Sequence, residues 1–261
     1  MAPNPWKVVG ASVAGFSHIA EGIPCQDFHS ATTSENGWFV CVVSDGAGSA
    51  SRGAEGSREI CEQLTGYLSV YLSEFTNLGV DPVIDEPDFR QTVTSGIELV
   101  RNLLETRTEA ESLSEFHATV VGVVAGPTGG VFFHIGDGSA CATDTRTLSP
   151  SVVSLPENGE YANETYFFTQ PIWHEHLRLT YFGEECDLVV LMSDGVSPFA
   201  MGPGGKELHA PFFGPISNYF TKNDTDKCRA ALIATLEKDA IRQITGDDKT
   251  LVWASRAISD V

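Results

Sequence analysis

Residues 38–48 read WFVCVVSDGAG, an apolar and β-branched run that ends in an aspartate followed by glycine. The same order of strand, acid and glycine returns in VFFHIGDGS and LVVLMSDGV, while GDDKTLVWA places the acid before the strand. Carboxylates at strand ends, beside glycines that let the backbone approach closely, are the ligands that Mg²⁺ or Mn²⁺ requires. The sequence therefore predicts a metal centre built on Asp45, Asp137, Asp194 and Asp247.

The order of these acidic turns resembles that of the metal-dependent protein phosphatases of the type 2C family, over about Gly15–Ala254. Further motifs follow in the expected order: a first strand region ending in PCQDFH, the SDGAGS turn, FHATVVGVVAG before IGDG, MSDGV, and a final DDKT. One Asp-Gly pair is common, whereas this ordered set is specific. The resemblance implies an α+β fold, a four-layer α-β-β-α sandwich of two mainly antiparallel sheets flanked by helices.

Apolar runs bounded by glycine or aspartate predict strands, and a five-residue Gly/Pro-rich segment after the second predicts a hairpin. The strands are Trp38–Ser44, Thr119–Ala125, Val131–Ile135, Leu188–Met192 and Thr250–Ala254. Such continuous apolarity indicates burial on both faces of a sheet. Helical periodicity runs through residues 60–71 and 89–104 and starts again at Cys228. We predict one domain over residues 1–261, with a flap within 199–221, a Pro/Gly-rich stretch too long for an ordinary connection.

The resemblance also implies a role for each acid. Asp45 corresponds to a carboxylate that bridges two metal ions, and Gly46 to a glycine that offers its carbonyl oxygen. Asp194 and Asp247 correspond to the remaining carboxylates of the first metal. Asp137 corresponds to a residue that, with the counterpart of Asp194, holds a third and weaker ion, although the residues after it depart from the usual GDSR. The alternative for Asp137 is an ordinary turn residue.

Three further polar residues are expected to support the metal centre. Gln26 and Asp27 match an acidic pair in which the first member orders metal-bound water, and the amide of Gln26 can still accept hydrogen bonds from water. Asp27 then supports the site from behind. Asp248 stands where asparagine is usual, and is expected to support the site without contacting a metal.

Two positions depart from the family pattern near the substrate. His18 stands near the place of an arginine that grips the substrate phosphate with a bidentate fork. It can contact phosphate, or it is a surface or structural histidine. Ala47 stands where animal relatives have a histidine that protonates the leaving group, so water must supply that proton.

The remaining histidines give weaker signals. His134 lies inside a strand pattern and is expected to be a core residue. His174 and His176 alternate in PIWHEH and have a spacing that could ligate zinc. The alternative is that they belong to a strand or loop that binds no metal.

Composition limits the partners and the setting. The chain has 261 residues and a net charge of −19, which opposes binding to nucleic acids or anionic membranes. It has no run of eighteen apolar residues and no basic-then-apolar leader, so we expect a cytoplasmic protein, and a monomer. The six scattered cysteines predict reduced thiols.

The function that the resemblance implies is hydrolysis of phosphoserine or phosphothreonine in proteins by a metal-activated water, opposite a serine/threonine kinase. Two ions, or three where the weaker one binds at Asp137, would activate that water. The chain has no Cys-x₅-Arg loop of a thiol phosphatase. Two alternatives stay open: a non-catalytic module that binds phosphoproteins, and a metal-dependent phosphatase of a small phosphorylated molecule.

Overall fold

The structure is a computed structural model that describes residues 6–77, 86–107, 112–149, 151–157 and 165–256. Within these residues, the strands form two five-stranded sheets in which all neighbours are antiparallel. The first sheet has the order β1 (Trp6–Val13), β10 (Lys249–Arg256), β9 (Leu188–Met192), β6 (Ser139–Thr143), β7 (Ser151–Ser154). The second has the order β2 (Phe28–Thr33), β3 (Phe39–Ser44), β4 (Val120–Gly126), β5 (Gly129–Ile135), β8 (Arg178–Gly183).

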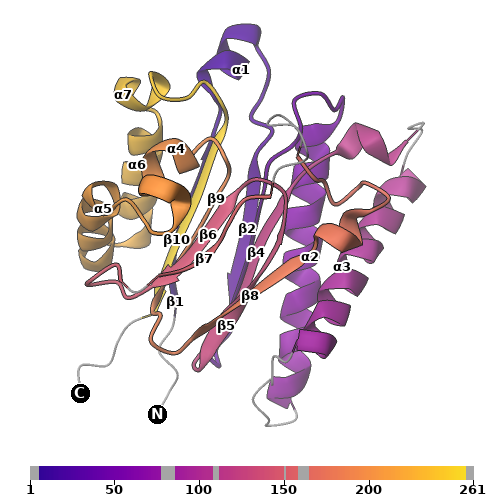
Figure 1. Cartoon of the computed structure of the whole chain (residues 1–261), viewed down its shortest axis with the longest axis horizontal. Helices are drawn as coiled ribbons and strands as arrows, with labels where there is room; N and C mark the ends of the chain where they lie inside the picture. Colours follow the sequence, from indigo (N-terminus) through magenta and orange to yellow (C-terminus); the bar gives the residue numbers. More distant parts are fainter. Residues whose placement is uncertain (1–5, 78–85, 108–111, 150, 158–164, 257–261) are drawn as a thin grey trace.

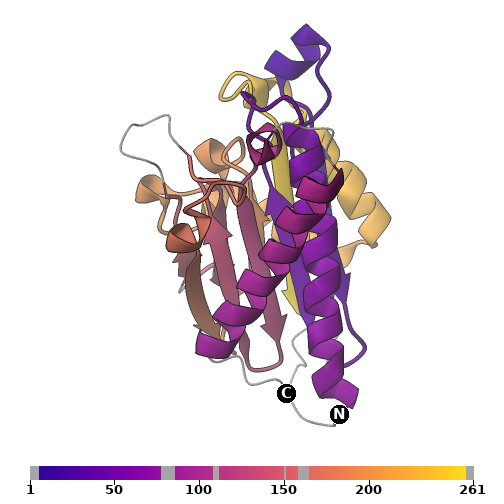
Figure 2. The same ribbon diagram turned by 90° about the vertical axis from the view of Figure 1, so that its right-hand side faces the viewer.

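Helices cover the outer face of each sheet (Figures 1 and 2). The long helices α2 (Gly53–Asn77) and α3 (Glu86–Arg107) pack on the second sheet, and α5 (Ala210–Lys222) and α6 (Thr225–Leu236) pack on the first. The layers therefore run helix, sheet, sheet, helix, which confirms the predicted four-layer sandwich. The helices predicted from residues 60–71, 89–104 and from Cys228 onward are α2, α3 and α6.

Strand β3 shows why its sequence is apolar without alternation. Cys41 and Val43 point into the core between the two sheets, while Val40 and Val42 point toward α2 and α3 on the other face. Both faces of the strand are therefore removed from water, and each large apolar side chain buried in this way contributes about 1.5–3 kcal/mol. The predicted burial on both faces is confirmed for this strand.

Five strands, β1, β2, β6, β7 and β8, lie outside the predicted ranges. Strand β2 reads FHSATT and is only half-buried at the edge of its sheet, so its sequence lacks the apolar run used for prediction. The expected first strand region ending in PCQDFH is wrong in detail, because residues 16–21 form helix α1 (Phe16–Glu21) and β2 begins at Phe28. Gly22, with φ of 70°, ends that helix in the left-handed conformation that glycine tolerates.

The stretch 199–221, where a flap is predicted, is largely packed structure. It holds the end of α4 (Ser197–Ala200), the 3₁₀ turn η3 (Pro203–Gly205) and most of α5, whose Phe213 and Phe220 are buried against the first sheet. No residue of this stretch lines the pocket described below. The predicted position of the flap finds no support in this packing, and one domain over residues 1–261 stays a prediction.

All six cysteines are free thiols, and five of them are buried. Their state agrees with the prediction of reduced cysteines. In the described part of the chain, no helix is long and apolar enough to cross a membrane.

Candidate metal centre

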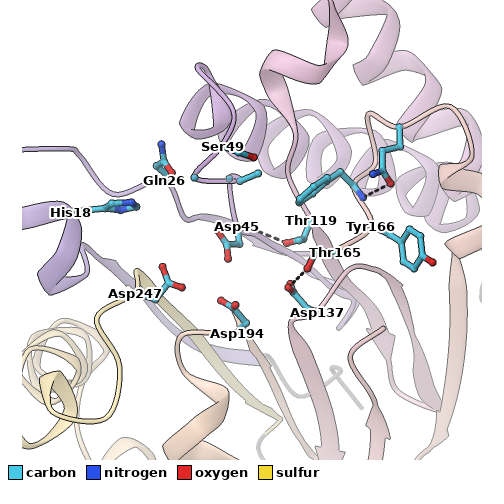
Figure 3. Close-up of a pocket in the computed structure, with 15 residues that line it drawn as sticks. His18, Gln26, Asp45, Ser49, Thr119, Asp137, Thr165, Tyr166, Asp194 and Asp247 are labelled. Atoms are coloured by element: carbon cyan, nitrogen blue, oxygen red, sulfur yellow. Dashed lines mark hydrogen bonds between the residues drawn. The ribbon is translucent and has the colours of Figure 1, made fainter. Parts of the chain in front are cut away.

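The four aspartates of the sequence motifs lie at the same end of the two sheets. Asp45 follows β3 and Asp137 follows β5, and these strands run in the same direction because each is antiparallel to β4. Asp194 follows β9, whose end lies beside the start of its antiparallel neighbour β10, just after Asp247. All four line one pocket of about 650 Å³. Figure 3 shows the carboxylates of Asp45, Asp194 and Asp247 directed toward a common space, with Asp137 on its other side.

The Asp45–Gly46 turn is fixed by backbone contacts that leave no room for a side chain at Gly46. The N–H of Asp45 donates to Thr119 Oγ1 at 3.0 Å, and the N–H of Gly46 donates to the carbonyl oxygen of Gln26 at 3.2 Å. A Cβ at Gly46 would lie 2.4 Å from the carbonyl carbon of Gly53 at the start of α2. Glycine is therefore required here for close approach of the backbone.

Burial and mutual repulsion disfavour the charged form of three of these carboxylates, those of Asp45, Asp137 and Asp194, in the absence of a cation. Burial, followed by the charges of Asp27 and Asp194, raises the pKa of Asp45 well above its usual value. Burial and the charges of Asp137 and Asp247 raise the pKa of Asp194 to about 6. Burial also raises the pKa of Asp137, although a hydrogen bond from Thr165 opposes the shift. A cation among these side chains would relieve the repulsion.

The residues present fit a divalent cation. Among the described residues, neither lysine nor arginine lines the pocket. Oδ1 of Asp194 and Oε1 of Gln26 are buried without a hydrogen-bond partner. A buried oxygen of this kind lowers the stability of the fold unless a donor or a cation contacts it. As the described side chains stand, however, no group of three His, Cys, Asp or Glu is already gathered as a metal site.

Asp27 lies behind the pocket, not on its lining. Its Oδ2 accepts a hydrogen bond from Ser193 Oγ at 2.6 Å, and its Oδ1 is buried without a partner. Burial raises the pKa of Asp27 to about 7, although the bond from Ser193 opposes the shift. This position agrees with the expectation that Asp27 supports the site from behind.

Asp248 is a buried junction between three segments, with 2% of its side chain exposed. Its Oδ1 accepts the N–H of Gly15 at 2.6 Å, and its Oδ2 accepts the N–H of Gln26 at 2.5 Å. His18 Nδ1 lies 2.9 Å from Oδ1, an ion-pair contact if the imidazole is protonated. Asp248 does not line the pocket, so its oxygens tie the chain before β2 to the turn that carries Asp247.

His18 reaches the pocket from α1, and Figure 3 shows its ring at the edge of the space between the carboxylates. Its side chain is 19% exposed and contacts Asp248, as described above. The surface interpretation of His18 is therefore not supported by its position. Ala47 lines the same pocket and brings no proton donor in its side chain.

The other histidines do not form a second site. His134 is fully buried, with Nδ1 2.9 Å from Ser154 Oγ, which confirms the core assignment. His174 and His176 lie in the short 3₁₀ turn η2 (Trp173–His176), so of the strand or loop expected without metal, the structure shows a turn within a connection and not a strand. The ring of His176 stacks on Tyr166, and the described residues hold no zinc-like group of ligands.

One wall of the pocket was missed from the sequence. Residues Thr165, Tyr166, Phe167 and Gln170 line it, and Figure 3 shows Thr165 and Tyr166 on the side of Asp137. Thr165 Oγ1 donates a short hydrogen bond to Asp137 Oδ2, and Gln170 Oε1 accepts the N–H of Phe167 at 3.1 Å. No motif marks these residues, so the only signal in the sequence is the length of residues 144–170, a Pro/Gly-punctuated segment longer than an ordinary connection.

The fold of the chain is that of a phosphatase family. A profile of the protein phosphatase 2C family matches residues 14–237, and the chain belongs to that family. The chain is 30% identical over 261 residues to serine/threonine-protein phosphatase 3 of Escherichia coli K12, covering 95% of this chain and 98% of that protein. It is therefore a homologue of a serine/threonine phosphatase of type 2C.

Solved structures support the fold at lower identity. A bacterial serine phosphatase superposes with a TM-score of 0.64 at 14% identity, over 98% of this chain and 99% of the other. The catalytic domain of the phosphatase PstP, in complex with two manganese ions, superposes with a TM-score of 0.61 at 15% identity, over 97% and 99%. The two sheets flanked by helices are thus the fold of the family.

Proposed function

We propose that this protein hydrolyses phosphoserine and phosphothreonine in other proteins and depends on Mg²⁺ or Mn²⁺ to do so. The observation that supports metal dependence most directly is the composition of the pocket. Four carboxylates line it, and none of the described residues that line it is a lysine or an arginine. A phosphate dianion would be repelled from such a pocket unless cations were bound there first.

The proposed metal ligands are the carboxylates of Asp45, Asp194 and Asp247 and the carbonyl oxygen of Gly46, with Asp137 and Asp194 available for a third ion. When bound, two divalent ions would supply an activated water for attack on phosphorus and neutralise charge on the phosphoryl oxygens. The contribution of the chain is to fix these oxygens at strand ends, where the backbone contacts of Asp45 and Gly46 hold the turn.

The other pocket residues are proposed to bind and orient. His18, placed at the edge of the pocket, would contact the phosphate. The unpartnered Oε1 of Gln26 can accept a hydrogen bond from water. Asp27 and Asp248 would hold these elements without contacting the substrate. Because Ala47 has no acidic proton, solvent would protonate the departing serine or threonine oxygen.

The proposed setting is the cytoplasm, with a serine/threonine kinase as the opposing activity and the protein acting as a monomer. The net charge of −19 argues against nucleic acid or an anionic membrane as a partner.

The test is hydrolysis of p-nitrophenyl phosphate and of a phosphothreonine peptide, with added Mn²⁺, with Mg²⁺ and with excess chelator. We expect activity only with metal, and loss of most of it in Asp45→Ala and in Asp194→Ala, which remove oxygen ligands. Asp226→Ala, an exposed carboxylate on α6, is the matched control and should keep wild-type activity. Full activity in chelator or in either pocket variant would refute the proposal. Binding of the phosphopeptide without turnover would favour the non-catalytic alternative.

A further inference from the structure

Helix α1 projects beyond the ends of the sheets, at the top of both overall views (Figures 1 and 2), and its His18 lines the pocket. It has six residues, Phe16–Glu21, and buries none of their side chains. Its two large apolar side chains face solvent, with Phe16 55% exposed and Ile19 54% exposed. The helix therefore owes none of its position to a hydrophobic core.

Hydrogen bonds hold α1 in place instead. Asp248 accepts the N–H of Gly15 just before the helix, and the N–H of Ser17 donates to the carbonyl oxygen of Gly246 at 3.0 Å. At the other end, the N–H of Gly22 caps the carbonyls of the last turn. Isolated helices of this length are marginal in water, so these bonds fix an otherwise unstable helix to the turn that carries Asp247.

The same helix reaches the pocket and carries the exposed apolar side chains. His18 lines the pocket, whereas Phe16 and Ile19 do not. A third exposed apolar residue, Ile244 at 54% exposure, lies two positions before Gly246, the residue bonded to Ser17. Large exposed apolar patches mark surfaces that partners cover, and these side chains lie on the helix that reaches the pocket or two positions from the residue bonded to it.

We propose that α1 docks the polypeptide that flanks the phosphorylated residue, through contacts of Phe16 and Ile19 with apolar side chains of the substrate. This inference rests on the proposed phosphatase function. A phosphoresidue in the pocket continues on both sides into its own chain, and α1, which carries His18, is one of the elements at the rim that this chain can cross. A small phosphorylated molecule would end within the pocket and would leave α1 uncovered.

The experiment compares the double variant Phe16→Ser, Ile19→Ser with the wild type on three substrates in the presence of Mn²⁺. These are p-nitrophenyl phosphate, a phosphothreonine peptide with leucines on both sides of the phosphoresidue, and the same peptide with serines in place of the leucines. The matched control is the double variant Val70→Ser, Leu99→Ser, which removes exposed apolar side chains from the outer helices α2 and α3.

We expect the α1 variant to lose about tenfold in kcat/KM on the leucine peptide. This is the effect of losing the burial of roughly half the surface of two apolar side chains, Phe16 and Ile19, in the complex with the peptide. Its kcat/KM on p-nitrophenyl phosphate should be unchanged, and the control variant should match the wild type on all substrates. Equal loss on all three substrates, or no loss on the leucine peptide, would overturn docking at α1 while leaving the phosphatase function intact. Failure of the wild type to hydrolyse any substrate would refute the proposed function itself.

The exposed side chains of α1 could instead be covered by a second copy of the chain, and light scattering of the wild type and the α1 variant tests this alternative. The inference expects the same monomeric mass for both proteins. A wild-type dimer that the two substitutions dissociate would assign the apolar side chains of α1 to self-association and would overturn substrate docking.

Discussion

Substitution of Asp248 by asparagine should destabilise the protein although it removes only a charge. The two carboxylate oxygens accept the N–H groups of Gly15 and Gln26, at 2.6 and 2.5 Å, in a site that is 2% exposed. Asparagine keeps one acceptor and turns a donor toward the other N–H. A hydrogen bond to a charged group contributes about 1.5–3 kcal/mol, and a buried donor left unsatisfied costs about 1–3 kcal/mol. We expect a total loss of about 2.5–6 kcal/mol.

The measurement is urea unfolding of the metal-free proteins at neutral pH. Asp247→Asn is the matched control, because Asp247 is the adjacent acid, lines the pocket and accepts only the N–H of Asp248 among the side-chain hydrogen bonds of the described residues. It should change the free energy of unfolding by less than about 1 kcal/mol. The interpretation of Asp248 as a junction is refuted if Asp248→Asn is as stable as the wild type, or no less stable than Asp247→Asn.

The remaining predictions concern charge, metal and substrate. Because the folded pKa of Asp27, about 7, lies above its ordinary value of 3.8, metal-free protein should lose stability from this group as the pH rises between these values. Asp27→Asn should remove a few kcal/mol of that pH dependence in denaturant titrations, and identical slopes for variant and wild type would contradict it. Mn²⁺ at one hundred times its dissociation constant should stabilise the wild type by about 2.7 kcal/mol, or about 5–10 °C in Tm. Asp45→Ala should abolish this shift in thermal unfolding, and a retained shift would place the ion elsewhere. His18→Ala should raise KM for p-nitrophenyl phosphate more than it lowers kcat, while unchanged kinetics would exclude phosphate contact. Asp137→Ala should retain two tightly bound Mn²⁺ by calorimetry but need more metal for turnover, and loss of both ions would make Asp137 a ligand of the main pair.

The sequence predicted those parts of the fold whose residues are dictated by burial on both faces. Strands β3 and β9 are continuously apolar because one face meets the other sheet and the opposite face meets helices. The four acidic turns were predictable for a related reason, since each follows or precedes such a strand and contains a glycine. The half-buried strand β2 was missed because its sequence, FHSATT, is neither continuously apolar nor regularly alternating between apolar and polar residues.

The contacts of Asp248 and the wall formed by Thr165 and Tyr166 could not be predicted, because they join segments far apart in the sequence. The hydrogen bond between Asp248 and Gly15 joins residues 233 positions apart, and the one between Thr165 and Asp137 joins residues 28 positions apart. No local pattern records such pairings. Helix α1 escaped prediction for another reason, since it buries no apolar face and therefore leaves no periodicity to detect.

The pocket draws two of its acids from each sheet, with Asp45 and Asp137 on one and Asp194 and Asp247 on the other. Their separation is therefore set by the thickness of the layer between the sheets, which is built partly of small side chains such as Cys41, Ala125, Ala140, Ala142 and Ala254. Adding a methyl group to that layer would move the two pairs of carboxylates apart, since packed interiors transmit such strain. Under the proposed metal dependence, metal preference would then change with substitutions that never touch the pocket.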